Sequence, residues 1–130
     1  MHRASPIHWS ILPNSCRLTW GDNTDEVLIA ANLVRGAGTS ARPGDYSVVL
    51  LRKITKGEVQ TIPLVEEYYL TACIGECAPA THRVAALLDM SGDGVIEIVL
   101  AWRDYKGRGK AVYQVEDGEV TNVLSWACAP

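Results

Sequence analysis

The hydrophobic residues of this chain lie in short runs that are rich in Val, Ile and Leu and are separated by Gly, Pro, Asp and Asn. Such runs are typical of β-strands, and no segment repeats its hydrophobic residues with the period of an amphipathic helix. The segment 65–71 contains paired tyrosines, which favour a short strand over a helical turn. The pattern therefore predicts strands over residues 17–20, 26–34, 46–53, 58–64, 83–89, 95–103, 110–116 and 119–126.

The same order of segments occurs twice along the chain. Residues 26–30 (EVLIA) match residues 97–101 (EIVLA), and residues 56–59 (KGEV) match residues 117–120 (DGEV). A repeat of this length is one supersecondary unit that cannot bury its apolar surface alone. We therefore expect one all-β domain over residues 1–130, with a two-sheet β-sandwich as the alternative architecture. The domain would consist of two antiparallel four-stranded repeats, at about 17–70 and 81–127.

One loop carries the residues that a hard cation requires. Residues 89–97 (DMSGDGVIE) offer oxygen ligands at every second position: Asp89, Ser91, Asp93, the Val95 carbonyl and Glu97. Calcium takes about six to eight oxygens, which a tight loop can direct to one point. An EF-hand is excluded, because its twelfth position needs Glu where this chain has Leu100, and because its flanks are helical. An ordinary hairpin turn is the alternative, since turns favour the same residue types.

Residues 88–99 (LDMSGDGVIEIV) resemble the Asp-x-Asp/Asn-x-Asp-Gly-x-x-Asp/Glu repeat of the FG-GAP and VCBS-type β-propeller proteins, which integrin α-subunits also carry. The resemblance covers about residues 81–127. It implies that the loop joins the first two strands of a four-stranded propeller blade and binds calcium through Asp89, Asp93, Glu97 and the Val95 carbonyl. Ser91 departs from the family pattern, because a hydroxyl replaces a carboxylate or carboxamide. We therefore expect weak binding, with a Kd of about 10⁻⁴–10⁻³ M.

The first repeat does not keep this ligand set. Asp22 and Glu26 fall where the second repeat has its third and last side-chain ligands, but Leu18 and Trp20 replace the other two. Two carboxylates without the remaining oxygens make a poor calcium cage. We therefore expect one calcium site in the chain, not two.

The charge balance gives no reason to expect nucleic acid as a partner. The chain has 12 Lys and Arg against 15 Asp and Glu, with a net charge of −3, and no basic stripe accompanies its aromatic residues. No apolar run reaches the roughly 18 residues of a membrane span. The first residues lack the apolar core of a signal peptide, which indicates a cytosolic protein or a mature or trimmed chain. The family resemblance implies an extracellular or periplasmic location instead.

Four cysteines permit two disulfides. We favour Cys73–Cys77, which closes a small loop between the repeats, and Cys16–Cys128, which joins the two ends of the chain. Free buried thiols and a zinc site are the alternatives, although the usual two-residue spacing of zinc ligands is absent.

Residues 102–105 place aromatic rings and charges at the end of a predicted strand. Trp102, Arg103 and Tyr105 are therefore candidates for ligand binding, and core packing with a polar rim is the alternative. His82 lies near Cys77 in the sequence, but no nucleophile motif accompanies the pair.

These observations favour a non-catalytic binding or interaction module that is stabilised by calcium and whose ligand is a protein or a carbohydrate. The alternative is a small enzyme or an accessory domain of a polysaccharide-active enzyme. The second strand of each repeat is apolar almost throughout, which suggests that both faces of each sheet need cover. We therefore expect a homo-oligomer, most simply a dimer.

Overall fold

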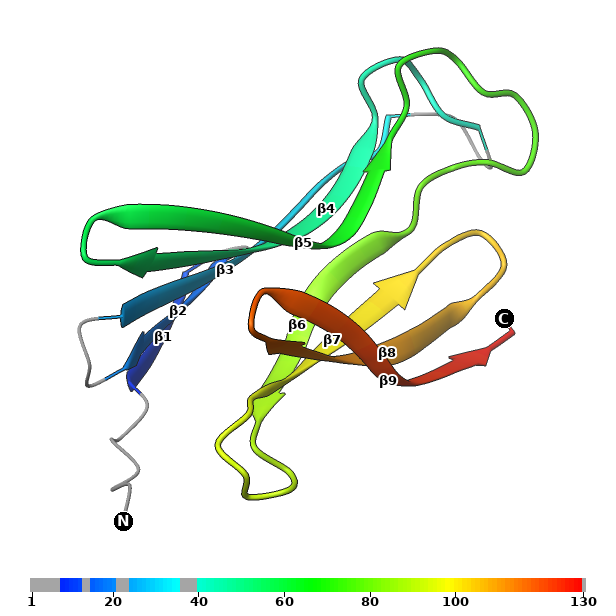
Figure 1. Cartoon of the computed structure of the whole chain (residues 1–130). Coiled ribbons are helices and arrows are strands. Elements are labelled where there is room, and N and C mark those ends of the chain that lie inside the picture. The colour runs from blue at the N-terminus through cyan, green and yellow to red at the C-terminus, as the bar shows by residue number, and fades with distance from the viewer. Residues whose placement is uncertain (1–7, 13–14, 21–23, 36–39, 130) are drawn as a thin grey trace.

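A computed structural model describes residues 8–12, 15–20, 24–35 and 40–129, and Figure 1 shows them as two antiparallel sheets. The five-stranded first sheet has the order β1-β2-β3-β4-β5, and the four-stranded second sheet has the order β6-β7-β8-β9. The described residues contain no helix, so the all-β, two-sheet prediction is confirmed. The strands are β1 (His8–Leu12), β2 (Ser15–Trp20), β3 (Thr24–Leu33), β4 (Tyr46–Thr55), β5 (Glu58–Tyr68), β6 (Thr81–Leu88), β7 (Glu97–Arg103), β8 (Arg108–Glu116) and β9 (Glu119–Cys128).

Two features of the first sheet differ from the expectation. β1 is an additional strand before the first repeat. The second repeat has no equivalent strand, so the duplication in the sequence does not predict β1. β5 continues to Tyr68 and takes in most of the segment that was ambiguous between strand and helical turn. Pro63 lies within β5, opposite Leu50 and beside a shift in register. A proline is tolerated there because β5 is an edge strand and the ladder is already irregular.

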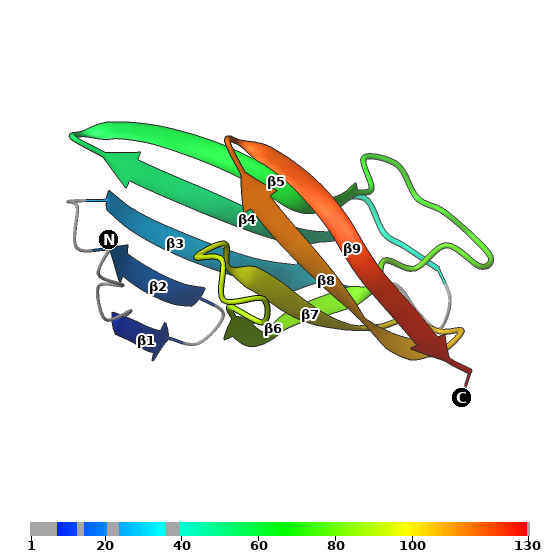
Figure 2. The ribbon, with the colours of Figure 1, turned by 60° about the horizontal axis from the view of Figure 1, so that its bottom comes forward.

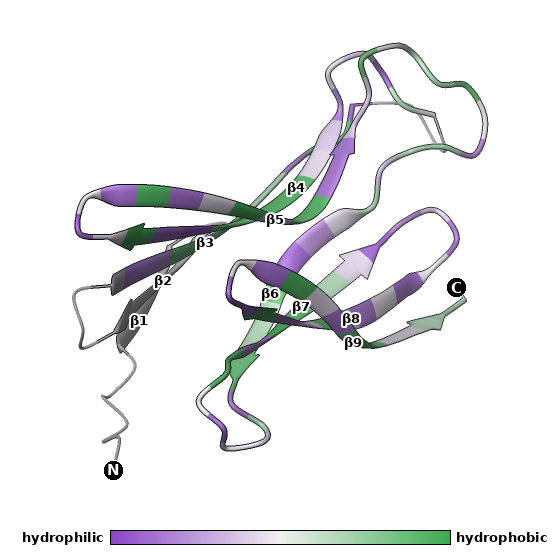
Figure 3. Ribbon diagram, in the orientation of Figure 1, coloured by the Kyte–Doolittle hydropathy of each residue, from purple (hydrophilic) through white to green (hydrophobic). Residues whose placement is uncertain are grey.

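A hydrophobic core lies between the two sheets. Leu28 pairs with Leu51, and Leu51 pairs with Ile62, so these side chains share one face of the first sheet. Apolar and polar residues alternate along several strands, as Figure 3 shows. The buried core cluster draws on both sheets and consists of Leu28, Ala30, Val49, Leu51, Ile62, Ile98 and Leu100.

The two sheets are stacked, and β1 to β5 in one sheet follow one another in the same direction as β6 to β9 in the other (Figure 2). β6 contacts β3 and β4 at one side of the stack, and the last strands β5 and β9 contact each other at the other side. The turns that precede β5 and β9 are also equivalent. Lys56 and Gly57 have φ angles of 50° and 83°, and Asp117 and Gly118 have φ angles of 52° and 78°. Two successive positive φ angles are the mark of a type I′ hairpin turn, so the matched KG and DG pairs perform the same role in the two sheets.

Candidate metal site and cationic pocket

Three carboxylates meet in the loop between β6 and β7. Oxygen atoms of Asp89, Asp93 and Glu97 all lie within 4.8 Å of one another. Asp89 and Asp93 are exposed, whereas Glu97 is 2% exposed. Carboxylate oxygens are the ligands that hard divalent cations prefer. This group can therefore hold a metal ion, and it contains the three charged ligands that the sequence predicts.

The loop is folded around the carboxylate of Asp89. Its Oδ1 accepts a hydrogen bond of 2.8 Å from Gly92 N–H, and its Oδ2 accepts one of 3.0 Å from Gly94 N–H. Gly92 and Gly94 have φ angles of +71° and +83°, a conformation that glycine adopts without steric cost. The two glycines thus allow the backbone to turn its N–H groups toward Asp89.

Asp93 is held by its own neighbours in the loop. Its Oδ1 accepts a hydrogen bond of 2.9 Å from Val95 N–H. This bond, together with one from the Ser91 side chain, keeps the pKa of Asp93 below its ordinary value. Asp93 is therefore ionised in neutral solution, as a metal ligand must be. Ser91 lies beside the carboxylate group, as the motif predicts.

Glu97 is the buried member of the group. Its Oε2 accepts a hydrogen bond of 2.9 Å from Met90 N–H, and its Oε1 accepts one of 3.0 Å from the amide Nε2 of Gln114. Gln114 is the register partner of Glu97 on β8. No sequence motif marks Gln114, because its place beside Glu97 depends on the register of the β7–β8 hairpin. Asp22, the remnant of the motif in the first repeat, lies outside the described residues.

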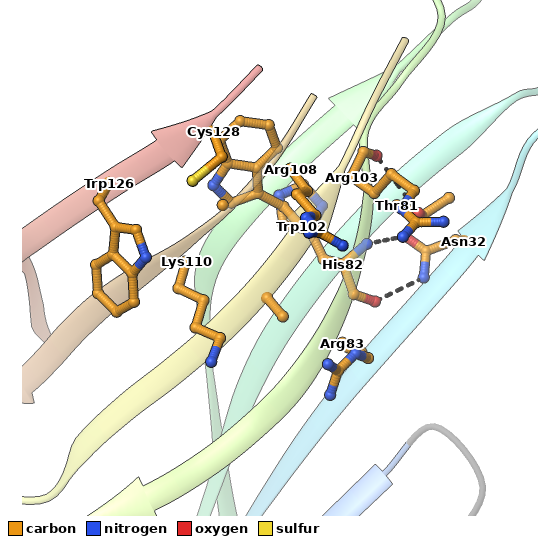
Figure 4. Close-up of a pocket in the computed structure, with 12 residues that line it drawn as sticks. Asn32, Thr81, His82, Arg83, Trp102, Arg103, Arg108, Lys110, Trp126 and Cys128 are labelled. Carbon is orange, nitrogen blue, oxygen red and sulfur yellow. Dashed lines mark hydrogen bonds between the residues drawn. The ribbon is translucent and has the colours of Figure 1, made fainter. Parts of the chain in front are cut away.

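A pocket of about 620 Å³ lies at the opposite end of β7. Figure 4 shows that Trp126 and Cys128 form one side of it and Asn32 and Thr81 the other. Among the described residues, its lining includes four cationic side chains, Arg83, Arg103, Arg108 and Lys110, and no acidic residue.

Two of the three predicted ligand-binding residues line the pocket. Arg103 is exposed there, and Trp102 is half-buried and lies against Gly109, where an added Cβ would come within 2.6 Å of the indole. Tyr105 is not among the pocket residues. Its hydroxyl donates a hydrogen bond of 2.6 Å to the Glu76 carbonyl, so Tyr105 anchors the neighbouring loop.

A polar junction ties the two sheets together beside the pocket. The Ser47 hydroxyl donates to Asn32 Oδ1 at 2.6 Å and lies 2.7 Å from His82 Nδ1. Because the single hydroxyl proton goes to Asn32, the His82 Nδ1–H donates to Ser47. Burial lowers the pKa of His82. Ser47 is 0% exposed, so this serine–histidine pair lacks the access and the proton arrangement of a nucleophile and its base.

The cysteines follow the prediction in one pair and not in the other. Cys73 and Cys77 form a disulfide, so Cys77 has no free thiol to pair with His82. Cys128 is free and exposed, and the predicted Cys16–Cys128 bridge is not formed. The topology explains this, because Cys16 is paired between β1 and β3 in the first sheet, whereas Cys128 ends the edge strand β9 of the second sheet.

Comparisons with models of protein families, with curated proteins and with solved structures give no match to this chain. The resemblance to FG-GAP and VCBS-type repeats therefore stays a prediction that rests on the motif at residues 89–97. The described residues contain no helix that is long and apolar enough to cross a membrane.

Proposed function

We propose that this protein is a non-catalytic binding module whose second sheet is stabilised by one calcium ion. The observation that carries the proposal is the convergence of Asp89, Asp93 and Glu97 within 4.8 Å at the start of β7. Three like charges at this separation repel one another. A divalent cation would remove that repulsion and fix the connection between β6 and β7.

The chemistry of the surrounding residues fits calcium. In the part of the chain that the structure describes, no Lys or Arg forms an ion pair with these carboxylates. Ser91 and the Val95 carbonyl are the proposed neutral ligands, and solvent would supply the remaining oxygens, as is common for calcium in flexible loops. With three carboxylates and an exposed loop, we expect a weak site, with a Kd of about 10⁻⁴–10⁻³ M.

Two observations favour binding over catalysis. Ser47, which contacts His82, is buried within the junction between the sheets, and Cys77, which precedes the same histidine in the sequence, is part of a disulfide. In contrast, the pocket at the far end of β7 combines exposed cations with an exposed tryptophan, a composition that suits recognition of a ligand.

Thermal unfolding with calcium and with a chelator tests the proposal. The wild-type protein should gain about 2.7 kcal/mol of unfolding free energy at a calcium concentration a hundredfold above Kd. Asp93→Asn removes one ligand charge and should abolish most of this gain. Glu66→Gln is the matched control, because it removes one carboxylate from an exposed position on β5 in the other sheet, and it should keep the whole gain.

The alternative outcomes are distinct. Equal stabilisation of wild type and Asp93→Asn by calcium would contradict the assignment of the site. Equal stabilisation of the wild type by calcium and by magnesium would contradict the choice of ion, because magnesium requires a near-ideal octahedral shell of closer ligands, whereas calcium accepts an irregular one.

A further inference from the structure

The four cations of the pocket lie on one face of the second sheet. Arg83 is in register with Ala101, Ala101 with Lys110, and Lys110 with Trp126, so this row crosses all four strands. Register partners on neighbouring strands share a face, and so do residues two positions apart on one strand. Arg103 and Arg108 are register partners two positions further along β7 and β8. They therefore belong to the same face as the first row.

This face points away from the core. Leu100 and Trp102 occupy the alternate positions of β7, and Leu100 is part of the core between the sheets. The exposure pattern agrees, because His82, Trp102 and Gly109 are half-buried whereas the residues of the two cationic rows on β6, β8 and β9 are exposed. We call Arg83, Arg103, Arg108 and Lys110 the cationic face.

Two of the positive charges on this face lie close together. Arg103 and Arg108 stand directly opposite each other on neighbouring strands, and like charges in this arrangement destabilise a sheet. Within the described ranges, none of the four cations forms an ion pair. Asp104 is the acidic residue nearest in sequence, but its Oδ1 accepts hydrogen bonds from Lys106 N–H and Gly107 N–H and so closes the β7–β8 turn.

The indole of Trp126 accompanies these charges. Trp126 is 45% exposed and ends the row that contains Arg83 and Lys110. Figure 4 shows its indole beside Lys110, on the side of the pocket away from Asn32. Trp102 also lines the pocket, but it occupies an alternate position of β7 and so belongs to the other face of the sheet. Trp126 is therefore the one indole on the cationic face among the residues that the structure describes.

We infer that the cationic face and Trp126 bind an acidic oligosaccharide. This inference rests on the proposed function, since it names the ligand class of the binding module. The guanidinium forks of Arg103 and Arg108 match the paired oxygens of a carboxylate or sulfate group. The π face of the indole attracts the partly positive C–H groups of a sugar ring. The hollow of about 620 Å³ has the size of a small-ligand site.

Single-stranded nucleic acid fits this surface less well. Proteins that bind it combine a cationic groove with a series of aromatic rings on which successive bases stack, whereas the described lining of this pocket has two indoles, Trp102 and Trp126, at positions on opposite faces of the sheet. The chain as a whole has a net charge of −3, which opposes the long-range attraction of a nucleic-acid backbone. Acidic sugars need only a local cluster of cations and one stacking platform.

Titration calorimetry of the intact chain with calcium tests the inference. The probes are a uronate oligosaccharide, a sulfated oligosaccharide, an uncharged oligosaccharide of the same length and single-stranded DNA. We expect the better of the two acidic sugars to bind at least about tenfold more tightly than the uncharged sugar, because each charge-assisted hydrogen bond contributes strongly. Comparison of the affinities for the uronate and the sulfated oligosaccharide identifies which anionic group the protein recognises.

The variants separate the cationic face from general charge effects. The double variant Arg103→Gln/Arg108→Gln and the single variant Trp126→Ala should each weaken acidic-sugar binding at least about tenfold. Arg52→Gln removes the charge of an exposed arginine on β4, in the other sheet, and should leave binding unchanged. Without ligand, the double variant should unfold at a higher temperature than the wild type, because the facing positive charges are gone.

Four results would overturn the inference: equal binding of charged and uncharged sugars, tighter binding of DNA than of either acidic sugar, equal losses in Arg52→Gln and the double variant, or no sugar binding at all. Thermal unfolding with calcium is measured on the same samples. If no sugar binds but calcium still stabilises the protein, this inference alone is overturned. If an acidic sugar binds but calcium does not stabilise the protein, the inference is supported and the calcium part of the proposed function is overturned.

Discussion

Ser47 and His82 join the two sheets through a hydrogen bond of 2.7 Å between Ser47 Oγ and His82 Nδ1. Asn32 completes the junction, because its side chain donates to the His82 carbonyl and accepts from the His82 N–H, both at 2.9 Å. β6 is an edge strand, and Asn32 satisfies backbone groups of this edge in place of another strand. The junction thus fixes β3 and β4 to the first strand of the second sheet.

We predict that this junction makes the protein less stable as the pH falls. Burial lowers the pKa of His82 in the folded state from its ordinary value of 6.5. The stabilisation from neutral His82 is complete above the unfolded-state pKa, and it is lost progressively as the pH falls toward and through the lower folded-state pKa. Chemical unfolding at about pH 7.5 and about pH 5 measures this loss.

His82→Gln is the control for this prediction, because glutamine does not titrate and every other titrating group is retained. Its unfolding free energy should fall less than that of the wild type over the same pH interval. An equal fall in the two proteins would show that other groups cause the pH dependence.

The local features of the fold could be predicted from the sequence because they depend on neighbouring residues. The KG and DG turns and the apolar strands are local patterns, and their duplication revealed both sheets. β1 escaped prediction because it stands outside the duplication. The junction of Ser47, His82 and Asn32 also escaped, since it joins residues separated by up to 50 positions, and no local pattern signals such a contact.

We predict that Glu97→Gln and Glu97→Ala differ in the absence of calcium. In Glu97→Gln the new amide can accept from Met90 N–H and, if the amide of Gln114 turns over, donate to Gln114, so both hydrogen bonds persist. Glu97→Ala leaves both partners unsatisfied at a buried position and should lower the unfolding free energy by about 1–3 kcal/mol. Thermal unfolding with a chelator makes the comparison.

Calcium should then separate Glu97→Gln from the wild type, because the variant keeps the fold but loses one ligand charge. The calcium-dependent rise in melting temperature should be smaller in the variant. If calcium raised the melting temperature of Glu97→Gln as much as that of the wild type, Glu97 would not be a ligand.

We predict that Gly109→Ala destabilises the second sheet by about 1–3 kcal/mol, the usual cost of inserting atoms into a well-packed site. The new Cβ would lie 2.6 Å from the Trp102 indole and would also meet the Trp126 carbonyl. Chemical unfolding measures the loss. The same substitution in a Trp102→Ala background should cost less, and an equal cost in both backgrounds would exclude any contribution of the indole.

The positions of the candidate site residues depend on strand register. The carboxylate group could be predicted because Asp89, Asp93 and Glu97 share one loop. Trp102 and Arg103 are adjacent in sequence, and alternation along β7 places them on opposite faces. The cationic face consists of residues from β6, β7 and β8 that converge only when those strands pair. No contiguous motif in the chain contains them.

We propose, as a last prediction, that the chain forms a homo-oligomer, most simply a dimer. β9 is an edge strand, and Val123 and Leu124 on it are 45% and 54% exposed. A long edge with apolar side chains is a site for association unless it is covered. Light scattering at micromolar concentration with calcium should give a mass of two or more times 14.2 kDa.

Leu124→Glu should shift the protein toward the monomer because it places a charge in the apolar contact. Thr61→Glu, at an exposed position on β5, should leave the mass unchanged. A strictly monomeric wild-type protein would contradict the oligomer and favour a self-contained β-sandwich.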